Sequence, residues 1–385
     1  MAWPPNWETA GLQYLARDGH ILVRDADISR VQEVLGGRPV GDRPSNINGL
    51  TLFAYAEDRD LTVESACDLL DRELGRGVAT PDHVFYVVPA SGTCPATEPE
   101  PVHSPCRPYP EPGADPCAGE GVLVKILDSG LFEGAAQDYD WLSGVTGDTE
   151  DTYFPAPPDR SIRHYAGHGT FSAGVVRTMA PGAEVTVLHT FTPVHAGSTY
   201  ESELASDIVQ ALSDGPDIIS LSFGTYTRSD IPPLGIDVLE PLLRGSSEVV
   251  LVAAAGNDST RDRFWPAAYP WVTSVGALDR SWTRRAWFSN HGCWVSIYAP
   301  GEDLVNAFPK GVFTCNEPPN KGQGRVFTGM GRWSGTSFAT PMVAGMIAAR
   351  MTVTGESAPE AVAALRAEAV AKRIPGVGPV LVPGS

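Results

Sequence analysis

The segment Gly121-Val122-Leu123-Val124-Lys125-Ile126-Leu127-Asp128 is an apolar run of strand length that ends in a carboxylate. Its apolar residues do not alternate with polar ones, and this pattern predicts a parallel β-strand that is buried on both faces of a sheet. Three later runs share this character: Val185 to His189, Asp217 to Ser222 and Glu248 to Ala255. Together the four runs predict a mainly parallel sheet.

Helical patterns lie between and after these runs. The segment Glu203 to Leu212 places apolar residues on one face, and Ser357-Ala358-Pro359-Glu360 is a capping box that opens an Ala-rich helix. Strands that alternate with helices predict a doubly wound parallel α/β fold, in which ligands bind at the carboxyl ends of the strands.

The composition limits the partners that we expect for this chain. Its 385 residues are 42% apolar and carry a formal net charge of −18. A charge of this sign repels phosphate backbones and anionic membrane surfaces. No stretch reaches the roughly 18 consecutive apolar residues that a membrane helix needs. We therefore expect neither a nucleic-acid partner nor a membrane partner.

The chain divides into three parts. Prolines recur among Ser, Thr, Glu and Gly across residues 91–119, which predicts an extended, solvated linker. Before it, residues 1–90 predict a small α/β unit with strands at His20 to Arg24, Gly49 to Ala56 and His83 to Val88. Helices are predicted after Asp27 and after Thr62. Residues 120–385 form the large α/β unit.

The N-terminus and the cysteines bear on the cellular compartment. The first residues show neither a basic region nor an apolar region, so no signal peptide is recognised and a cytoplasmic protein is expected, with non-classical export left open. The six cysteines form no C-x-x-C pair, which favours unpaired thiols. A bridge between Cys293 and Cys315 is the pairing that stays open.

Four short segments carry residues that are suited to nucleophilic catalysis. Asp128 ends a predicted strand, and His168 stands in Gly167-His168-Gly169 just before a helix. Ser337 opens a helix of small residues, where the unsatisfied N–H groups favour an anion. Asn257 follows a buried strand and has an amide donor. Each residue taken alone also fits a structural role, as a turn residue or a helix cap.

Taken together, these segments resemble the subtilase family, the subtilisin-like serine proteases of peptidase family S8. The motifs Asp-Ser-Gly, Gly-His-Gly-Thr, Ala-Ala-Ala-Gly-Asn and Gly-Thr-Ser-Phe-Ala-Thr-Pro occur in the family's order between Gly121 and Arg350. The resemblance implies a serine endopeptidase with Ser337 as nucleophile, His168 as base and Asp128 as its orienting carboxylate. Asn257 would be an oxyanion donor. No cofactor and no catalytic metal are implied.

The resemblance also implies where a peptide or protein substrate binds. Ser222, Phe223 and Gly224 look like the family's substrate-aligning strand. Ala253, Ala254 and Gly256 look like a wall of the pocket for the residue before the scissile bond. The strand from His83 is similar to the last strand of the family's propeptide, so the N-terminal unit is expected to act as an intramolecular inhibitor.

Two features depart from the family or compete with it. Only 12 residues separate His168 from Ala180-Pro181, which leaves no room for the calcium-binding loop found there in many subtilases. His164 and His168 have the i, i+4 spacing of a zinc protease, but Tyr165 stands where that motif needs Glu. A catalytically silent subtilase fold that serves as a binding module or scaffold is the main alternative function.

Overall fold

A computed structural model describes residues 14–40, 47–55, 61–87, 96–103, 107–155, 160–191, 197–245 and 248–384. The large unit is built on a seven-stranded parallel sheet with the order β14-β13-β12-β11-β6-β9-β7. The strands are β14 (Ile297–Pro300), β13 (Thr273–Leu278), β12 (Val250–Ala254), β11 (Ile218–Leu221), β6 (Leu123–Asp128), β9 (Glu184–His189) and β7 (Thr146–Gly147). All four predicted strands lie in this sheet, so the predicted doubly wound fold is confirmed.

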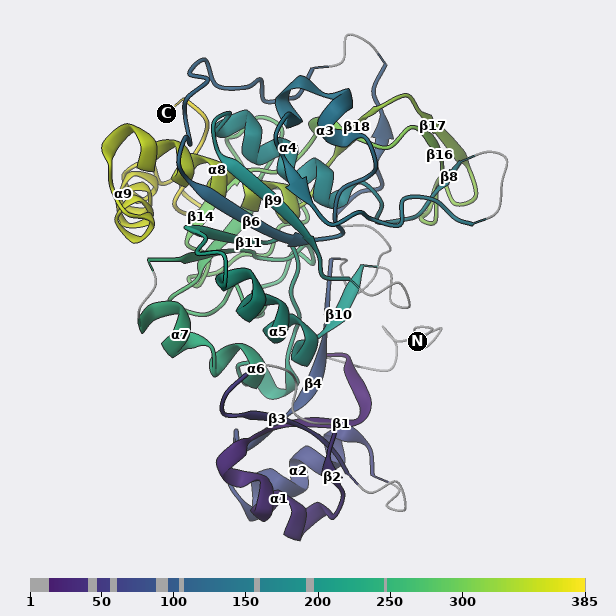
Figure 1. The fold of residues 1–385 in the computed structure, drawn as a ribbon, viewed down its shortest axis with the longest axis vertical. Helices are drawn as coiled ribbons and strands as arrows, with labels where there is room; N and C mark the ends of the chain where they lie inside the picture. The colour runs from purple at the N-terminus through teal and green to yellow at the C-terminus, as the bar shows by residue number, and fades with distance from the viewer. Residues whose placement is uncertain are drawn as a thin grey trace.

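Helices cover both faces of the sheet (Figure 1). One face packs on α4 (His168–Met179), α8 (Thr336–Thr354) and α9 (Ala358–Ala371). The other face packs on α5 (Glu201–Leu212), α6 (Leu234–Asp237) and α7 (Glu240–Gly245). Successive side chains of a strand enter opposite cores, since Ile218 belongs to the first and Ile219 to the second. The unalternating apolar runs follow from this arrangement.

Close packing of α4 against α8 brings two of the candidate residues onto adjacent helices. A Cβ atom placed on Gly345 of α8 would come 2.8 Å from the carbonyl oxygen of Val176 in α4. Glycine is therefore needed there for the helices to approach. His168 is the first residue of α4, and Ser337 is the second residue of α8.

Shorter elements complete the large unit. They are α3 (Ala135–Asp138), β5 (Glu100–Pro101), β8 (Ser161–Ile162), β10 (Ser198–Tyr200), β15 (Leu304–Ala307), β16 (Gly311–Thr314), β17 (Gly324–Phe327) and β18 (Met330–Trp333). The strands β16, β17 and β8 form one small sheet, and β15, β18 and β5 form another. Helix α9 begins with the predicted capping box, in which Ser357 N–H donates to Glu360 Oε2 at 2.9 Å.

The N-terminal unit has its own core and shares a sheet with the large unit. Its elements are β1 (Ala16–Arg24), α1 (Ile28–Leu35), β2 (Arg38–Pro39), β3 (Leu50–Ala54), α2 (Val63–Glu73) and β4 (Ala79–Tyr86). The order of the sheet is β10-β4-β1-β3-β2, so β10 of the large unit extends it by one strand. The predicted strands and helices are present. Ala56 and Val88, at the ends of two predicted strands, lie outside the described residues.

The expected solvated linker was wrong for residues 96–102, which pair with the large unit, whereas residues 111–117 are exposed. Ala96 N–H donates to the Ser334 carbonyl at 3.3 Å, and Trp333 Nε1 donates to the Thr97 carbonyl at 2.7 Å. Strand β5 pairs antiparallel with β18, and the Glu98 side chain is buried. Proline removes one donor per residue but leaves its carbonyl and its neighbours' N–H groups to pair, which is how this Pro-rich segment joins a sheet edge.

Two further findings concern the cysteines and the membrane. Cys67, Cys117, Cys293 and Cys315 are free thiols, so the open Cys293–Cys315 pairing is not formed. Cys94 and Cys106 lie outside the described residues. Within the described ranges, no helix is both long enough and apolar enough to cross a membrane.

Candidate active site

Asp128 and His168 form a fully buried pair at the carboxyl end of β6. His168 Nδ1 lies 2.6 Å from Asp128 Oδ1, and both side chains are completely inaccessible to solvent. The Asp128 carboxylate also accepts the Ser129 N–H at 2.7 Å and the Ser172 hydroxyl at 3.3 Å. Among the residues that the structure describes, His168 Nε2 has no hydrogen-bond partner. The carboxylate therefore fixes the ring through one nitrogen and leaves the other unengaged.

Two aromatic rings hold the imidazole in place. Trp333 contacts His168 edge-on with a centroid distance of 5.5 Å, and the Phe338 centroid lies at 5.1 Å. Phe338 follows Ser337 in α8, and Trp333 precedes it in β18. The segment that carries the serine thus also packs on the histidine.

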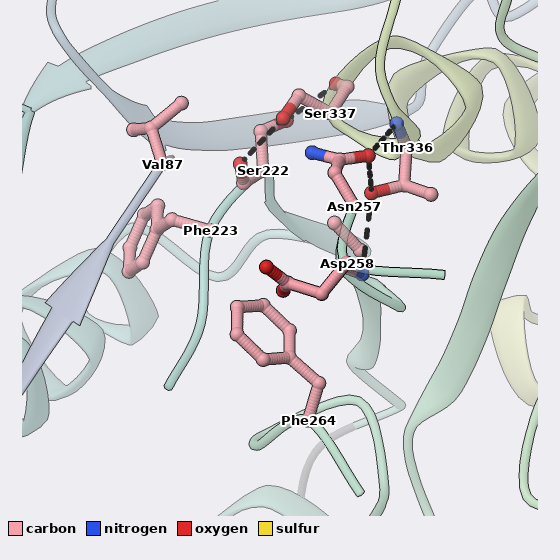
Figure 2. Close-up of a pocket in the computed structure, with 10 residues that line it drawn as sticks. Val87, Ser222, Phe223, Asn257, Asp258, Phe264, Thr336 and Ser337 are labelled. Atoms are coloured by element: carbon pink, nitrogen blue, oxygen red, sulfur yellow. Dashed lines mark hydrogen bonds between the residues drawn. The ribbon is translucent and has the colours of Figure 1, made fainter. Parts of the chain in front are cut away.

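Ser337 lies at the N-terminal end of α8, where the helix presents unsatisfied N–H groups. Its hydroxyl donates to the Ser222 carbonyl at 3.0 Å, and the Ser222 hydroxyl donates to the Ser337 carbonyl at 2.8 Å (Figure 2). These two bonds join the end of β11 to the start of α8.

Asn257 follows β12 and is bonded to the residue before Ser337. Its Oδ1 accepts both the Thr336 N–H and the Thr336 hydroxyl at 2.9 Å. The side-chain amide nitrogen points away from Thr336 (Figure 2). Because the oxygen is occupied by two donors, the orientation of the amide is set and its N–H groups remain to bind an acceptor.

A small cavity of about 10 Å³ lies beside Ser222, Asn257 and Ser337. It is lined by Val87, Ser222, Phe223, Ala254, Gly256, Asn257, Asp258, Phe264, Thr336 and Ser337. Four of the six predicted substrate-binding residues are in this lining. Gly224 is instead paired with Tyr86, and Ala253 is fully buried in the core that faces α5. Asp258, Phe264 and Val87 carried no sequence motif that marked them for this site.

The N-terminal unit reaches this cavity through an extended chain. Tyr86 N–H donates to the Gly224 carbonyl at 2.9 Å, and Gly224 N–H donates to the Tyr86 carbonyl at 3.1 Å. Val87 N–H donates to the Gly197 carbonyl at 3.0 Å, and β4 pairs antiparallel with β10. The end of β4 is therefore held between two segments of the large unit.

The sequence profile of the subtilase family matches residues 119–376, which is two thirds of the chain. The chain belongs to the subtilase family. The intracellular serine protease of Paenibacillus polymyxa is 29% identical over 244 residues, covering 60% of this chain and 66% of that protein. Subtilisin E of Bacillus subtilis (strain 168) is 28% identical over 243 residues, covering 60% of this chain and 55% of that protein. The thermophilic serine proteinase of Bacillus sp. (strain AK1) is 32% identical, and 41% of its length is covered. The chain thus spans about 40% to 66% of these relatives.

Solved structures show the same fold. Fervidolysin from Fervidobacterium pennivorans, a keratinolytic enzyme related to subtilisin, matches with a TM-score of 0.60 and 21% identity over 95% of this chain and 60% of that one. A cold-adapted subtilisin-like serine proteinase matches with a TM-score of 0.51 over 70% of this chain and 90% of that one. Because the first match covers 95% of the chain, the likeness of fold extends beyond the large unit into the N-terminal unit. The large unit is called the subtilase unit from here on.

A buried carboxylate braces the subtilase unit behind Asp128 and His168. Glu150 accepts the Gly167 N–H at 2.8 Å, the Ser129 hydroxyl at 3.0 Å and the Thr152 hydroxyl at 3.1 Å. Ser129 in turn accepts the Gly169 N–H. Burial raises the pKa of Glu150 to about 8, against the opposing effect of these hydrogen bonds. The carboxyl group links the residue after Asp128 to both neighbours of His168.

The interface between the N-terminal and subtilase units contains buried ionisable groups. His83 Nδ1 lies 2.5 Å from Glu201 Oε2, and both side chains are buried. Asp82 accepts the Ser202 N–H at 2.9 Å and the Ser202 hydroxyl at 3.0 Å. Burial raises the pKa of Asp82 to about 7. Arg228 of the subtilase unit pairs with Asp68 and Asp71 of α2.

Helix α4 runs from His168 to Met179 without interruption, as the short spacing before Ala180 predicts. In its last turn, Arg177 donates to the carbonyls of Ala183 at 2.7 Å, Trp141 at 3.1 Å and Ser143 at 3.1 Å. Over the ranges that the structure describes, no group of three His, Cys, Asp or Glu side chains is arranged to hold a metal ion. The Arg177 guanidinium joins the segment of Trp141 and Ser143 to Ala183, which lies beyond the end of α4.

Proposed function

We propose that this subtilase is a serine endopeptidase whose catalytic residues are Ser337, His168, Asp128 and Asn257. The observation that carries the proposal is the buried Asp128–His168 pair, which leaves His168 Nε2 unengaged beside the helix that carries Ser337 in its first turn. Such an arrangement gives each nitrogen of the imidazole a separate task. Membership of the subtilase family supports the same assignment.

In the proposed reaction, Ser337 Oγ attacks the peptide carbonyl carbon while His168 Nε2 accepts the hydroxyl proton. The hydroxyl leaves its present bond to the Ser222 carbonyl by rotation about Cα–Cβ. His168 then gives the proton to the amine, the C–N bond breaks, and water releases the acyl group by the reverse sequence. The Asp128 carboxylate holds the tautomer that this transfer needs.

The developing oxyanion would be held by two donors. The Asn257 side-chain amide is oriented by its two bonds from Thr336, and the Ser337 backbone N–H lies at the first turn of α8. Both donors are fixed before the reaction begins, so no reorganisation is needed when the charge appears.

An extended substrate is proposed to bind as the end of β4 now does. Its backbone would pair with Gly224 and Gly197, the same groups that bond to Tyr86 and Val87. The N-terminal unit would therefore compete with the substrate and inhibit the enzyme. We expect self-cleavage between Ala90 and Glu120, outside the stretch from Ala96 to Val102 whose backbone is paired with the subtilase unit.

We further propose that the enzyme acts in the cytoplasm. Similar proteins that are named intracellular serine proteases occur in Paenibacillus polymyxa and Bacillus subtilis (strain 168). Protein or peptide chains are the proposed substrates.

A fluorophosphonate probe tests the catalytic assignment directly. After removal of the N-terminal unit, wild-type protein should be labelled and should hydrolyse peptides, whereas Ser337→Ala should do neither and His168→Ala should be labelled far more slowly. Folded wild-type protein that resists the probe even without its N-terminal unit would instead support the silent binding module. Adding residues 1–90 in trans to the separated subtilase unit tests inhibition, and full activity despite both parts being folded would exclude it.

A further inference from the structure

The ring of Phe264 lies between the two chain segments that we propose as walls of the substrate pocket. A Cβ atom built on Gly224 would come 2.5 Å from Phe264 Cε1, and one built on Gly256 would come 3.1 Å from Phe264 Cδ1. The ring therefore contacts the segment 222–224 on one side and the end of β12 on the other. Phe264 also lines the cavity that contains Ser337 (Figure 2).

Neighbouring groups of the subtilase unit keep the ring there. Phe264 is 4% exposed, and Tyr226 contacts it edge-on at a centroid distance of 5.1 Å. The next residue, Trp265, exchanges two backbone hydrogen bonds of 2.8 Å with Thr225. Because Thr225 directly follows the 222–224 wall, the backbone that carries Phe264 cannot move away from that wall without breaking the pairing, while burial and the contact with Tyr226 hold the ring itself.

The same cavity carries a negative charge. Asp258 is part of its lining and accepts the Tyr226 hydroxyl at 2.7 Å. A carboxylate at this position repels an acidic side chain that enters the pocket. The pocket wall thus combines a large ring, which takes up space, with a negative charge, which repels aspartate and glutamate side chains of a substrate.

We propose that Phe264 restricts the substrate residue immediately before the scissile bond to glycine, alanine or serine. The inference rests on the proposed endopeptidase function and names the substrate class for it. A leucine or phenylalanine side chain would need the volume that the Phe264 ring occupies, and packed interiors do not yield such volume cheaply. Asp258 excludes the acidic residues of similar size.

The test uses the enzyme that the full-length chain yields after self-cleavage, with peptides that differ only at this one residue, which is alanine, leucine, phenylalanine or aspartate. Labelling with a fluorophosphonate gives the concentration of active enzyme. For the wild type, kcat/KM for the alanine peptide should exceed that for the phenylalanine peptide about 100-fold or more. Phe264→Gly should raise kcat/KM for the phenylalanine peptide about 10-fold or more, because the ring volume becomes available.

Phe154→Ala is the matched control, since this phenylalanine is 41% exposed and is not part of the cavity lining. Its preference should equal that of the wild type. Should Phe264→Gly fail to fold, Phe264→Ala and Phe264→Val must show a preference graded by the volume removed, with unchanged probe labelling.

Two results would overturn the inference. One is a wild-type enzyme that cleaves after phenylalanine as fast as after alanine, and another is a folded Phe264 variant with an unchanged preference. An enzyme that the probe labels but that cleaves the alanine, leucine and phenylalanine peptides with equal kcat/KM overturns this inference alone. A chain that is neither labelled nor active on any peptide overturns the proposed function as well.

Discussion

Replacing Arg177 with methionine removes a cation that joins the segment of Trp141 and Ser143 to Ala183, beyond the end of α4. The guanidinium donates to the carbonyls of Trp141, Ser143 and Ala183, so methionine keeps the apolar stem of the side chain but leaves these acceptors without their donor. Partial burial lowers the pKa of Arg177 by desolvation, and the group remains charged at neutral pH.

The loss of stability in Arg177→Met depends on the number and burial of these hydrogen bonds. A hydrogen bond to a charged group contributes roughly 1.5 to 3 kcal/mol, and an exposed one much less. Two of the three bonds are partly buried and the bond to Ser143 is exposed. The free energy of unfolding should therefore decrease by about 3 kcal/mol in Arg177→Met. At about 2 to 4 °C per kcal/mol, the melting temperature of the subtilase unit should fall by roughly 6 to 12 °C. The melting temperature of Arg177→Lys should lie between those of the wild type and Arg177→Met, because an ammonium reaches fewer of the three carbonyls.

Thermal unfolding with and without EDTA is the assay. We expect EDTA to leave the melting temperature and activity of the wild type unchanged, because the short spacing between His168 and Ala180 leaves no room for the calcium-binding loop found there in many subtilases. Arg244→Met is the control, since it removes only an exposed i, i+4 pair with Glu240 and should shift the melting temperature by less than about 2 °C. An Arg177→Met protein as stable as the wild type would refute the reasoning, and so would destabilisation of the wild type by EDTA that calcium reverses.

Three further predictions test the site and the interface. Asn257→Ala should lower kcat by roughly 100-fold with little change in KM, because the oxyanion forms only after substrate binding; a loss confined to KM would contradict its role. Burial raises the pKa of Asp82 to about 7, so the complex of the two units takes up a proton, and inhibition by the N-terminal unit in trans should strengthen as pH falls from about 8 to 6. Asp82→Asn should remove the pH dependence of this inhibition. An inhibition constant that is independent of pH in the wild type would contradict the role of Asp82. The folded-state pKa of Glu150 is raised from 4.5 to about 8, so its contribution to stability is lost as pH rises through that window; denaturant titrations of Glu150→Gln should lack this part of the pH dependence.

The sequence by itself determined the α/β class and the order of the catalytic candidates. Apolar runs without alternation predicted strands buried on both faces, and β6, β11 and β12 are such strands, whereas only one face of β9 is fully buried. Asp128 at the end of a strand and Ser337 at the start of a helix were placed by local signals alone. These features depend on neighbouring residues along the chain, which is why periodicity and caps reveal them.

Only the tertiary structure decided which distant segments meet. The pairing of Tyr86 with Gly224, the docking of β5 on β18 and the position of Phe264 between two glycines join residues far apart in the chain. The composition of residues 91–119 even predicted a solvated linker, because proline content describes local stiffness and not the sheet edge that is available to pair. Such contacts depend on the register and spacing of elements that pack in three dimensions, and no local pattern in the sequence encodes them.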